Sequence, residues 1–333
     1  MLTEEAQALN DLVERNETFV ILVHRYPEGD AIGSQLALGL MLMKQGKSVE
    51  MLNYDKLPWQ YKFLPGSEHI KIAESFQRDY DVGIVLDSSD FERTNYTESE
   101  KGMIRYLVNM DHHLSNNFFG DLNIINPQAS STGEMVYNLS KHMDIPLNRD
   151  IALNIYTAIV TDTGSFRYSN TTSETLMIAS KLVSKGIDVA WANENLFEIG
   201  TLGRIKLWGE TLSKIELTYH DLISILTVTQ QMLIQSNAEF NDTENLINNG
   251  LSIVGVEVSL LFKELSENTY KVSFRSKGKI NVAKVAEIFG GGGHFRASGC
   301  KISGTLEQVR DKVIKMVSKE LEAHGLTTEK TAN

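Results

Sequence analysis

FVILVHRYPEGDAIGSQLALGLMLMKQG, residues 19–46, is the stretch that decides the fold. Its first six residues form a short apolar run of the kind that makes a buried strand. Residues 31–46 place apolar side chains at helical spacing and end at Gly46, a residue type that commonly terminates helices. Further strand-like runs follow at 48–53, 81–87 and 104–110. Strands that alternate with helices predict an α/β fold whose parallel sheet is covered by helices on both faces.

The second half of the chain has a different character and predicts a second, smaller domain. Strand-like runs occur at 221–231, 251–265 and 269–277, and a helical pattern follows at 281–289. No strong turn signal interrupts residues 189–214. We therefore predict a first domain over 1–188, a helical connector over 189–214, a smaller α/β domain with a mixed sheet over 215–325, and a tail over 326–333.

The charge of the chain disfavours one class of function. The 333 residues include 32 Lys and Arg against 43 Asp and Glu, a formal net charge of −11 at pH 7. Proteins that coat long nucleic acids need basic surfaces, because their affinity comes largely from displaced counterions. Residues 271–301, however, carry seven Lys or Arg against one Glu, so their local charge is +6. We therefore expect no long nucleic acid as partner, but a small phosphate-bearing ligand remains compatible with the sequence.

The single cysteine, Cys300, indicates a reducing compartment, because it has no partner in the chain for a disulfide. The N-terminal residues are acidic and lack the apolar core of a signal peptide. No apolar run reaches the roughly 18 residues that a membrane span requires. We expect a cytoplasmic protein without membrane association, and a homodimer is a reasonable default.

Acidic and imidazole side chains gather where predicted strands end. These residues are His24, Glu28, Asp30, Asp87, Asp111, His112 and His113, with Asp162 after a later apolar run. Taken alone, His24 is better explained as a hydrogen-bonded histidine at a strand end, and Asp87 as a helix N-cap. Their recurrence at one sheet edge favours a ligand site, and divalent cations neutralise clustered carboxylates. A set without thiolate suits Mn²⁺, although zinc or cobalt would also bind.

Five stretches, in order along the chain, resemble the motifs of a known family. They are HRYPEGDAIGS (24–34), LDSSD (86–90), MDHH (110–113), VTDTGSFRYSNTT (160–172) and GGGGHFRASG (290–299). The first four resemble successive motifs of the DHH phosphoesterase superfamily. The fifth, with the residues before it, resembles the signature of the DHH-associated C-terminal domain. The resemblance spans nearly the whole chain and is greatest to the bacterial subfamily of bifunctional oligoribonucleases and 3′-phosphoadenosine-5′-phosphate phosphatases.

The resemblance implies two Mn²⁺ ions bridged by one carboxylate. The implied ligands are His24, Glu28 and Asp87 for one ion and Asp30, Asp87, His112 and Asp162 for the other. The family usually has Asp where this chain has Glu28, and the longer side chain predicts a looser or differently ligated first site. His113 would face the substrate phosphate, and Asp111 would fix the ring of a neighbouring histidine. Two-metal hydrolysis needs no covalent protein intermediate, because the ions activate a water and offset charge on the attacking and leaving oxygens.

The glycine run predicts a phosphate site in the second domain. Glycines at 290–293 would let backbone N–H groups approach a phosphate closely, although such runs also serve as hinges. The resemblance supplies partners for the phosphate, and the implied substrate contacts are Arg275, Gly291, Gly292, Gly293 and His294. Ser131 and Thr132 would contact substrate or, equally well, cap the helix that follows them.

The sequence therefore predicts a phosphoesterase, with two alternatives. The leading hypothesis is hydrolysis of oligoribonucleotides of about two to five nucleotides to 5′-mononucleotides, with 3′-phosphoadenosine 5′-phosphate as a further substrate, by analogy with the family. An enzymatic alternative is a phosphodiesterase for linear dinucleotides such as pApA, formed from cyclic di-AMP. An alternative of another class is a nucleotide-sensing module with impaired catalysis, for which Glu28 is the only support.

Overall fold

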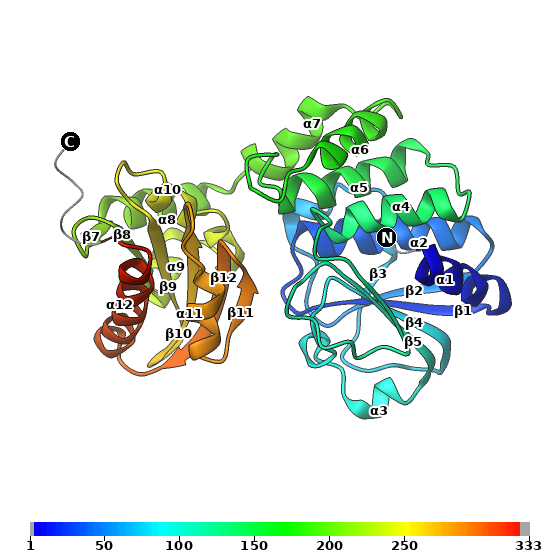
Figure 1. The fold of residues 1–333 in the computed structure, drawn as a ribbon, viewed down its shortest axis with the longest axis horizontal. Helices are drawn as coiled ribbons and strands as arrows, with labels where there is room; N and C mark the ends of the chain where they lie inside the picture. The colour runs from blue at the N-terminus through cyan, green and yellow to red at the C-terminus, as the bar shows by residue number, and fades with distance from the viewer. Residues whose placement is uncertain (1–2, 327–333) are drawn as a thin grey trace. The chain divides into compact units, whose positions relative to one another are not determined.

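The protein has two compact units, Met1–Ile199 and Gly200–Asn333, in a computed structural model that describes residues 3–326 (Figure 1). The side chain of His294 also lies outside the described part of the structure. Most of the predicted tail, 327–333, is likewise outside it. Each unit contains its own sheet and its own hydrophobic core.

The first unit contains a six-stranded parallel sheet, as the sequence predicts. Its strand order is β3-β2-β1-β4-β5-β6. The strands are β1 Thr18–Val23, β2 Ser48–Asn53, β3 Ile70–Ile72, β4 Tyr80–Leu86, β5 Ile104–Asp111 and β6 Leu122–Ile125. The chain runs outward from β1 to β3 and then returns to β4 on the other side of β1. The carboxyl ends of β1 and β4 therefore form a topological switch point, where open α/β sheets bind ligands.

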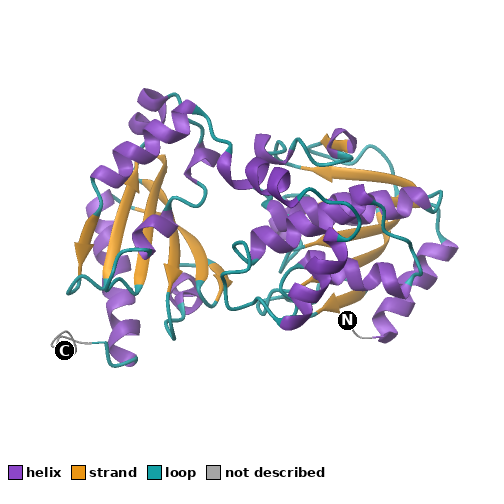
Figure 2. Ribbon diagram, turned by 90° about the horizontal axis from the view of Figure 1, so that it is seen from above, coloured by secondary structure: helices purple, strands orange, loops and turns teal. Residues whose placement is uncertain are grey.

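Both faces of this sheet are covered, but unequally. Ile21 packs into the larger core with the helices, whereas its neighbour Leu22 points to the opposite face and packs with Phe76 and Tyr96. The helices of the larger core are α1 Thr3–Arg15, α2 Gly29–Lys44, α4 Thr132–His142, α5 Arg149–Asp162 and α6 Ser173–Val183. The opposite face carries mainly loops and the short helix α3 Glu98–Lys101 (Figure 1), whereas Figure 2 shows helices in front of the strands of this unit. No helix among residues 3–326 combines the length and apolar character needed to cross a membrane.

The helical connector expected over 189–214 is interrupted near its middle. It consists of α7 Val189–Asn193, a π-helical turn at Glu194–Glu198, and α8 Leu202–Ser213. Thr201 starts α8 as its N-cap, since its side chain accepts a hydrogen bond from the N–H of Arg204. The division between the two units falls at residues 199 and 200, directly before this cap.

The second unit contains a mixed sheet, again as predicted, in the order β11-β12-β10-β9-β8-β7. Only β8 and β9 run parallel among the described pairs; the other neighbours are antiparallel. The strands are β7 Glu216–Thr218, β8 Ile223–Val228, β9 Val258–Ser266, β10 Thr269–Ser276, β11 Gly292–His294 and β12 Ala297–Ser303. After α8, the α-helices of this unit are α9 Gln230–Ser236, α10 Ile247–Leu251, α11 Val282–Ile288 and α12 Leu306–Ala323. The strand expected from residue 251 begins only at Val258, because α10 and a left-handed turn at Gly255 precede it.

Candidate metal centre

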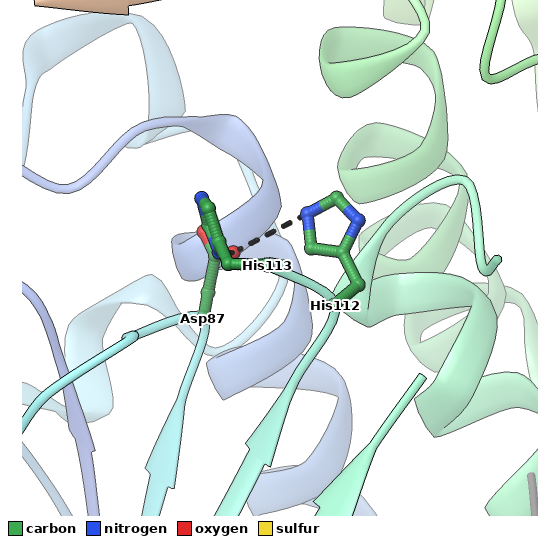
Figure 3. A group of neighbouring side chains, drawn as sticks. All are labelled: Asp87, His112 and His113. Carbon is green, nitrogen blue, oxygen red and sulfur yellow. Dashed lines mark ion pairs between the residues drawn. The ribbon is translucent and has the colours of Figure 1, made fainter. Parts of the chain in front are cut away.

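The carboxyl ends of three neighbouring strands bring the predicted ligands together. His24 follows β1, Asp87 follows β4, and His112 and His113 follow β5. Figure 3 shows Asp87 at the end of one strand and the two histidines at the end of the next. Helices supply the other two carboxylates, since Asp30 lies in the first turn of α2 and Asp162 ends α5.

The imidazole of His112 lies at the centre of three carboxylates. Its Nε2 atom is 3.6 Å from Asp30 Oδ2, 3.6 Å from Asp87 Oδ1 and 3.7 Å from Asp162 Oδ2. Ligand atoms at about 2.1 Å from one ion stand roughly 3.0–3.4 Å apart, so a small inward movement would bring these four atoms around a cation. His112, Asp30 and Asp87 are each about 95% buried, which makes their uncompensated charge costly.

The two oxygens of Asp87 face different histidines. Oδ1 is 3.6 Å from His112 Nε2, whereas Oδ2 is 3.6 Å from His24 Nε2. The other ring nitrogen of His24 lies 2.7 Å from the carbonyl oxygen of Arg25. A carbonyl can only accept, so Nδ1 carries a proton, and Nε2 is the ring atom that faces Asp87 and is available to a metal ion. The carboxylate of Asp87 therefore lies between two imidazoles, with one oxygen toward each.

The backbone of Asp87 is itself unusual. Its φ angle is 57°, which lies in the left-handed region that non-glycine residues seldom occupy. Its N–H donates to the carbonyl oxygen of Met110, which holds it against the neighbouring strand. Such strained residues cluster at functional sites, because the surrounding structure must hold them in place.

The N-terminus of α4 holds the carboxylate of Asp30. Thr132 N–H donates to Oδ2 at 2.7 Å and Gly133 N–H donates to Oδ1 at 2.9 Å. The hydroxyl of Ser34 also donates to Oδ1, at 3.0 Å. Because these donors come from the first turn of a helix, its dipole adds to the stabilisation of the negative charge. The position of Asp30 is therefore fixed by the protein itself.

Ser131 and Thr132, predicted as substrate contacts, instead lie beneath the site. Both are fully buried. The Ser131 side chain caps α4 by accepting from the N–H of Glu134, and the Thr132 hydroxyl donates to Asp87 Oδ1 at 3.3 Å. The capping alternative therefore describes Ser131, and Thr132 supports two carboxylates. Contact of either residue with substrate stays a prediction.

Asp111 fixes the ring of His113, as the sequence predicts. The fully buried carboxylate accepts from His113 Nδ1 at 2.6 Å and from the backbone N–H of His112 at 2.8 Å. Asn116 donates to its second oxygen at 2.7 Å. Because Nδ1 of His113 is engaged by Asp111, Nε2 is the ring atom oriented for a further role.

Asn170 is a supporting residue that sequence reasoning did not single out. Its Nδ2 lies 3.2 Å from Asp162 Oδ2 and 2.9 Å from the carbonyl oxygen of Ser130. It thereby ties the last residue of α5 to the loop before α4. Its position eight residues after Asp162, within the quoted stretch 160–172, was the available signal.

Glu28 is the predicted ligand that the structure leaves outside the cluster. Its side chain is exposed, and as the N-cap of α2 it makes no capping hydrogen bond. It lies close enough for its charge to contribute, after burial and Asp87, to raising the pKa of Asp162. No hydrogen bond at the start of α2 holds this carboxylate in place.

The clustered charges shift the pKa values of the groups around His112. Burial opposes protonation of His112, but the carboxylates of Asp162, Asp30 and Asp87 outweigh it and raise its pKa to about 9. Burial raises the pKa of Asp30 well above its usual value and that of Asp162 to about 6. Burial has the same tendency at Asp87, but the neighbouring imidazoles hold its pKa below the usual range. Without an ion, the cluster is therefore stabilised by a proton on His112.

The donor set fits a divalent metal. The ligand atoms of Asp30, His112 and Asp162 lie within 4.8 Å of one another, and so do those of Asp87, His112 and His113. Carboxylate oxygen and imidazole nitrogen without sulfur are the donors that Mn²⁺ and similar cations take. Because Nδ1 of His113 is bound to Asp111, we assign this ring to a role other than metal ligation.

In the second unit, Arg275 and the glycine run meet on one edge of the sheet. The register pairs Arg275 with Ala297 and Ala297 with His294, so these positions form one row across β10, β12 and β11. The Nε atom of Arg275 is buried without a hydrogen-bond partner, although Nη1 donates to the carbonyl oxygen of Phe274 at 3.1 Å. An unsatisfied buried N–H of this kind is uncommon and marks a place where an anion would be stabilised.

The three predicted glycine contacts are not equivalent. A Cβ at Gly291 would collide with the backbone at Gly299, and Gly293 adopts a φ of 139°. Nothing lies within 4 Å of a Cβ built on Gly292, so this residue borders open space. The run thus leads into the edge strand β11: glycine is required at Gly291 before the strand and at Gly293 within it, and Gly292 exposes its backbone.

Comparison with known proteins assigns each unit to a family model. Residues 18–159 match the DHH family, N-terminal domain, and residues 224–323 match the DHHA1 domain. Among solved structures, an exopolyphosphatase-related protein from Bacteroides fragilis superposes with a TM-score of 0.86 at 30% identity and covers 97% of both chains.

Several bacterial relatives are similar over most of the chain. The bifunctional oligoribonuclease and PAP phosphatase NrnA of Thermus thermophilus is 30% identical over 306 residues, covering 92% of this chain and 90% of that protein. The NrnA of Bacillus subtilis is 29% identical and covers 85% of this chain and 89% of its own length. The cyclic-di-AMP phosphodiesterase GdpP of Bacillus subtilis is 27% identical and matches 92% of this chain, but only 49% of GdpP.

Proposed function

Since this chain belongs to the DHH family, we propose that it is a metal-dependent phosphoesterase that hydrolyses short oligoribonucleotides to 5′-mononucleotides. We propose 3′-phosphoadenosine 5′-phosphate as a second substrate, which would yield AMP and phosphate. The observation that carries the proposal is the carboxylate of Asp87, whose two oxygens each face a different imidazole at 3.6 Å. This arrangement suits a carboxylate shared between two cations.

The proposed cofactor is a pair of Mn²⁺ ions. Their ligands would be His24, Asp87 and Glu28 for one ion and Asp30, Asp87, His112 and Asp162 for the other. When bound, such ions lower the pKa of a water and offset charge on the attacking and leaving oxygens. Four carboxylates balance the charge of two dications, which supports the number of ions.

The chain's own residues orient the groups that act on the phosphate. Asp111 keeps a proton of His113 on Nδ1, so that Nε2, when it carries the second proton of the ring, can donate to a phosphoryl oxygen or pass that proton to the leaving oxygen. Thr132 and Gly133 hold the carboxylate of Asp30 through backbone N–H groups, which keeps this carboxylate from moving into direct contact with His112. The burial of this cluster strengthens each of these interactions, because little water competes for them.

We propose that the second unit binds the part of the substrate remote from the reaction. Arg275 would bind a terminal phosphate through its planar guanidinium, and its unpartnered Nε supports this role. The glycines at 291–293 would offer backbone N–H groups to the same anion. His294, the remaining predicted contact, lies in the same row of the sheet.

We also propose that the protein is cytoplasmic and that it does not bind long nucleic acid. The lone Cys300 is free and buried, and burial raises the pKa of its thiol to about 12, so it suits the reducing cytoplasm as an inert core residue. The net charge of −11 disfavours binding to long nucleic acid, whereas the +6 charge of residues 271–301 favours short phosphorylated substrates.

Release of mononucleotides from a dinucleotide tests the function. The purified protein should hydrolyse pApA or a mixed dinucleotide in Mn²⁺ and should be inactive in EDTA. Asp87→Ala should abolish turnover, whereas Asp150→Ala, which removes an exposed carboxylate of the same unit, should remain active. Retained binding of a dinucleotide without turnover in Mn²⁺ would replace the enzyme by a nucleotide-sensing module. Activity of Asp87→Ala would refute the bridging assignment.

The similarity to GdpP, a cyclic-di-AMP phosphodiesterase, is consistent with a second candidate that we keep, a phosphodiesterase for linear dinucleotides such as pApA in cyclic-di-AMP turnover. The two candidates differ in substrate range rather than in the metal centre. The ratio of kcat/KM for pApA, a mixed dinucleotide and 3′-phosphoadenosine 5′-phosphate separates them. A strong preference for pApA would favour the second candidate, and comparable values would favour the first.

A further inference from the structure

An arginine directly after His24 is fixed in place beside the metal centre. Its Nε and Nη2 donate to the two oxygens of Asp55, each at 3.1 Å. Its backbone N–H donates to the carbonyl oxygen of Arg93 at 2.7 Å. This two-point contact gives the guanidinium of Arg25 a defined plane, because both hydrogen bonds must be satisfied together.

Two tyrosine rings lie against this guanidinium. The carbon at its centre is 4.8 Å from the ring centroid of Tyr26 and 5.1 Å from that of Tyr54. Tyr54 is partly buried and contacts Tyr96 edge-on. Tyr26, in contrast, is 55% exposed. The outermost ring of a supported aromatic stack is therefore presented to solvent.

The backbone at Tyr26, from which the ring projects, is held in a defined conformation. Its φ angle is 53°, a left-handed conformation that glycine or asparagine adopts with less strain than an aromatic residue. Its N–H donates to Asp55 Oδ2 at 3.0 Å, so the same carboxylate that orients Arg25 also fixes this backbone. Asp55 thus positions both members of the stack.

We propose that the ring of Tyr26 is a stacking platform for the nucleobase next to the scissile phosphate. Tyr26 is two residues from His24, so their Cα atoms are at most about 7 Å apart. A nucleobase is separated from its phosphate by one sugar, which places a base of the bound substrate within reach of this ring. The arginine behind the ring orients it, and every base offers a π-face to an aromatic side chain. This inference rests on the proposed function and adds a base site within the first unit.

If the ring of Tyr26 is a stacking platform, the protein should bind substrates with little preference for one nucleobase over another. Stacking uses the face of the base, whereas discrimination requires hydrogen bonds to its edge. Purines should bind more tightly than pyrimidines, since their larger faces cover more of the ring. The site thereby suits an enzyme that degrades short fragments of mixed sequence.

Steady-state kinetics test the platform. Tyr26→Ala should raise KM for a dinucleotide about tenfold, as expected for one lost stacking contact, with little change in kcat. Tyr26→Phe keeps the ring and should restore most of the affinity. A dinucleotide analogue that lacks the base next to the scissile phosphate should show no such difference between wild type and Tyr26→Ala.

The chain supplies a matched control in Arg105 and Tyr106. In this pair the guanidinium likewise lies 5.0 Å from the ring, but the pair lies near the amino end of β5, opposite the metal centre, and Tyr106 packs partly against the core. Tyr106→Ala should leave KM unchanged. An equal rise in KM for Tyr106→Ala and Tyr26→Ala would indicate a general loss of structure and would overturn the proposal.

A binding measurement in EDTA provides a second readout, independent of turnover. The fluorescence of a dinucleotide that carries 2-aminopurine should be quenched by wild type and Tyr26→Phe, and less so by Tyr26→Ala. Equal quenching and equal KM for Tyr26→Ala and wild type would refute the platform while leaving the phosphoesterase in place. Absence of dinucleotide hydrolysis by wild type would instead refute the proposed function.

Discussion

Replacing Asp111 by Asn would disturb His113 without removing a metal ligand. The two side chains have nearly the same shape, so the change leaves no cavity, but it removes the buried negative charge. The carboxylate now accepts from His113 Nδ1, the backbone N–H of His112 and the amide of Asn116. An asparagine has one oxygen and one NH₂ group, and cannot accept on both sides.

Neither orientation of the new amide satisfies these donors. If its oxygen faces His113, its NH₂ faces the NH₂ of Asn116. Asn116 cannot turn over freely, since its oxygen accepts from Asn109 and from the N–H of Phe118, and its NH₂ also donates to Ser88. If the NH₂ of the new amide faces His113 instead, it meets the N–H of His112 and the ring must change its protonated nitrogen.

The expected cost follows from the lost charge-assisted hydrogen bond to His113. Such bonds contribute about 1.5–3 kcal/mol. If this stabilisation is lost in the transition state, kcat should fall about 10- to 150-fold at saturating Mn²⁺. Turnover of a dinucleotide over a range of Mn²⁺ concentrations measures kcat and the apparent metal affinity separately. Asp121→Asn is the matched control, because its carboxylate accepts from the N–H of Leu107 away from the site.

A kcat for Asp111→Asn within twofold of wild type would refute this reasoning. It would mean that the ring of His113 needs no fixed orientation, so that its contact with the phosphate contributes little. A fall in Mn²⁺ affinity with unchanged kcat would also contradict the assigned role, because His113 would then act through the metal.

Three further predictions concern the remote phosphate of the substrate, the first metal site, and the proton that His112 loses when metal binds. Arg275→Ala should raise KM for phosphate-ended substrates about tenfold with kcat nearly unchanged, since remote binding is lost; a fall confined to kcat would place this arginine at the reacting phosphate. Glu28→Asp should raise the melting temperature by improving the cap of α2, worth about 0.5–2 kcal/mol, and should retain Mn²⁺ binding. Loss of Mn²⁺ binding in that variant would mean that the site requires the longer side chain. Because the pKa of His112 is raised to about 9 in the metal-free protein, Mn²⁺ must displace its proton at neutral pH, and apparent affinity should increase as pH rises toward 9. Calorimetry at pH 7 in buffers of different ionisation enthalpy should show release of at least one proton, and a buffer-independent enthalpy would contradict ligation by His112.

The sequence predicts the central strands of the first sheet well, because each is a continuous apolar run. It does not predict β3 and β6, which are three and four residues long and lie at the edges of the sheet. Short edge strands bury few side chains, so their apolar pattern is weak. The interruption before α8 was missed for a similar reason, since Thr201 acts as a cap only when the chain has already turned.

The candidate site is likewise predictable from the sequence only in part. The strand ends identify His24, Asp87 and His112, because carboxyl ends of parallel strands share one edge. The groups that hold the ligand residues in place cannot be predicted in the same way. Thr132 and Asp30 are 102 residues apart, and the group that connects them is a backbone N–H, which every residue except proline carries. Only the fold shows that this particular N–H meets a carboxylate.

Because backbone N–H groups hold the carboxylate of Asp30, this support of the metal centre can persist when the side chain of the donating residue changes. Exchange of Thr132 for another residue removes the hydroxyl near Asp87 but leaves the N–H that holds Asp30, and proline alone would delete this donor. Gly133 is more restricted, because a Cβ there would meet the side chain of Ala158. Mutational scans of this turn should therefore find that the buried position 132 accepts other residues of similar size, whereas position 133 accepts almost none, although both donate to the same carboxylate.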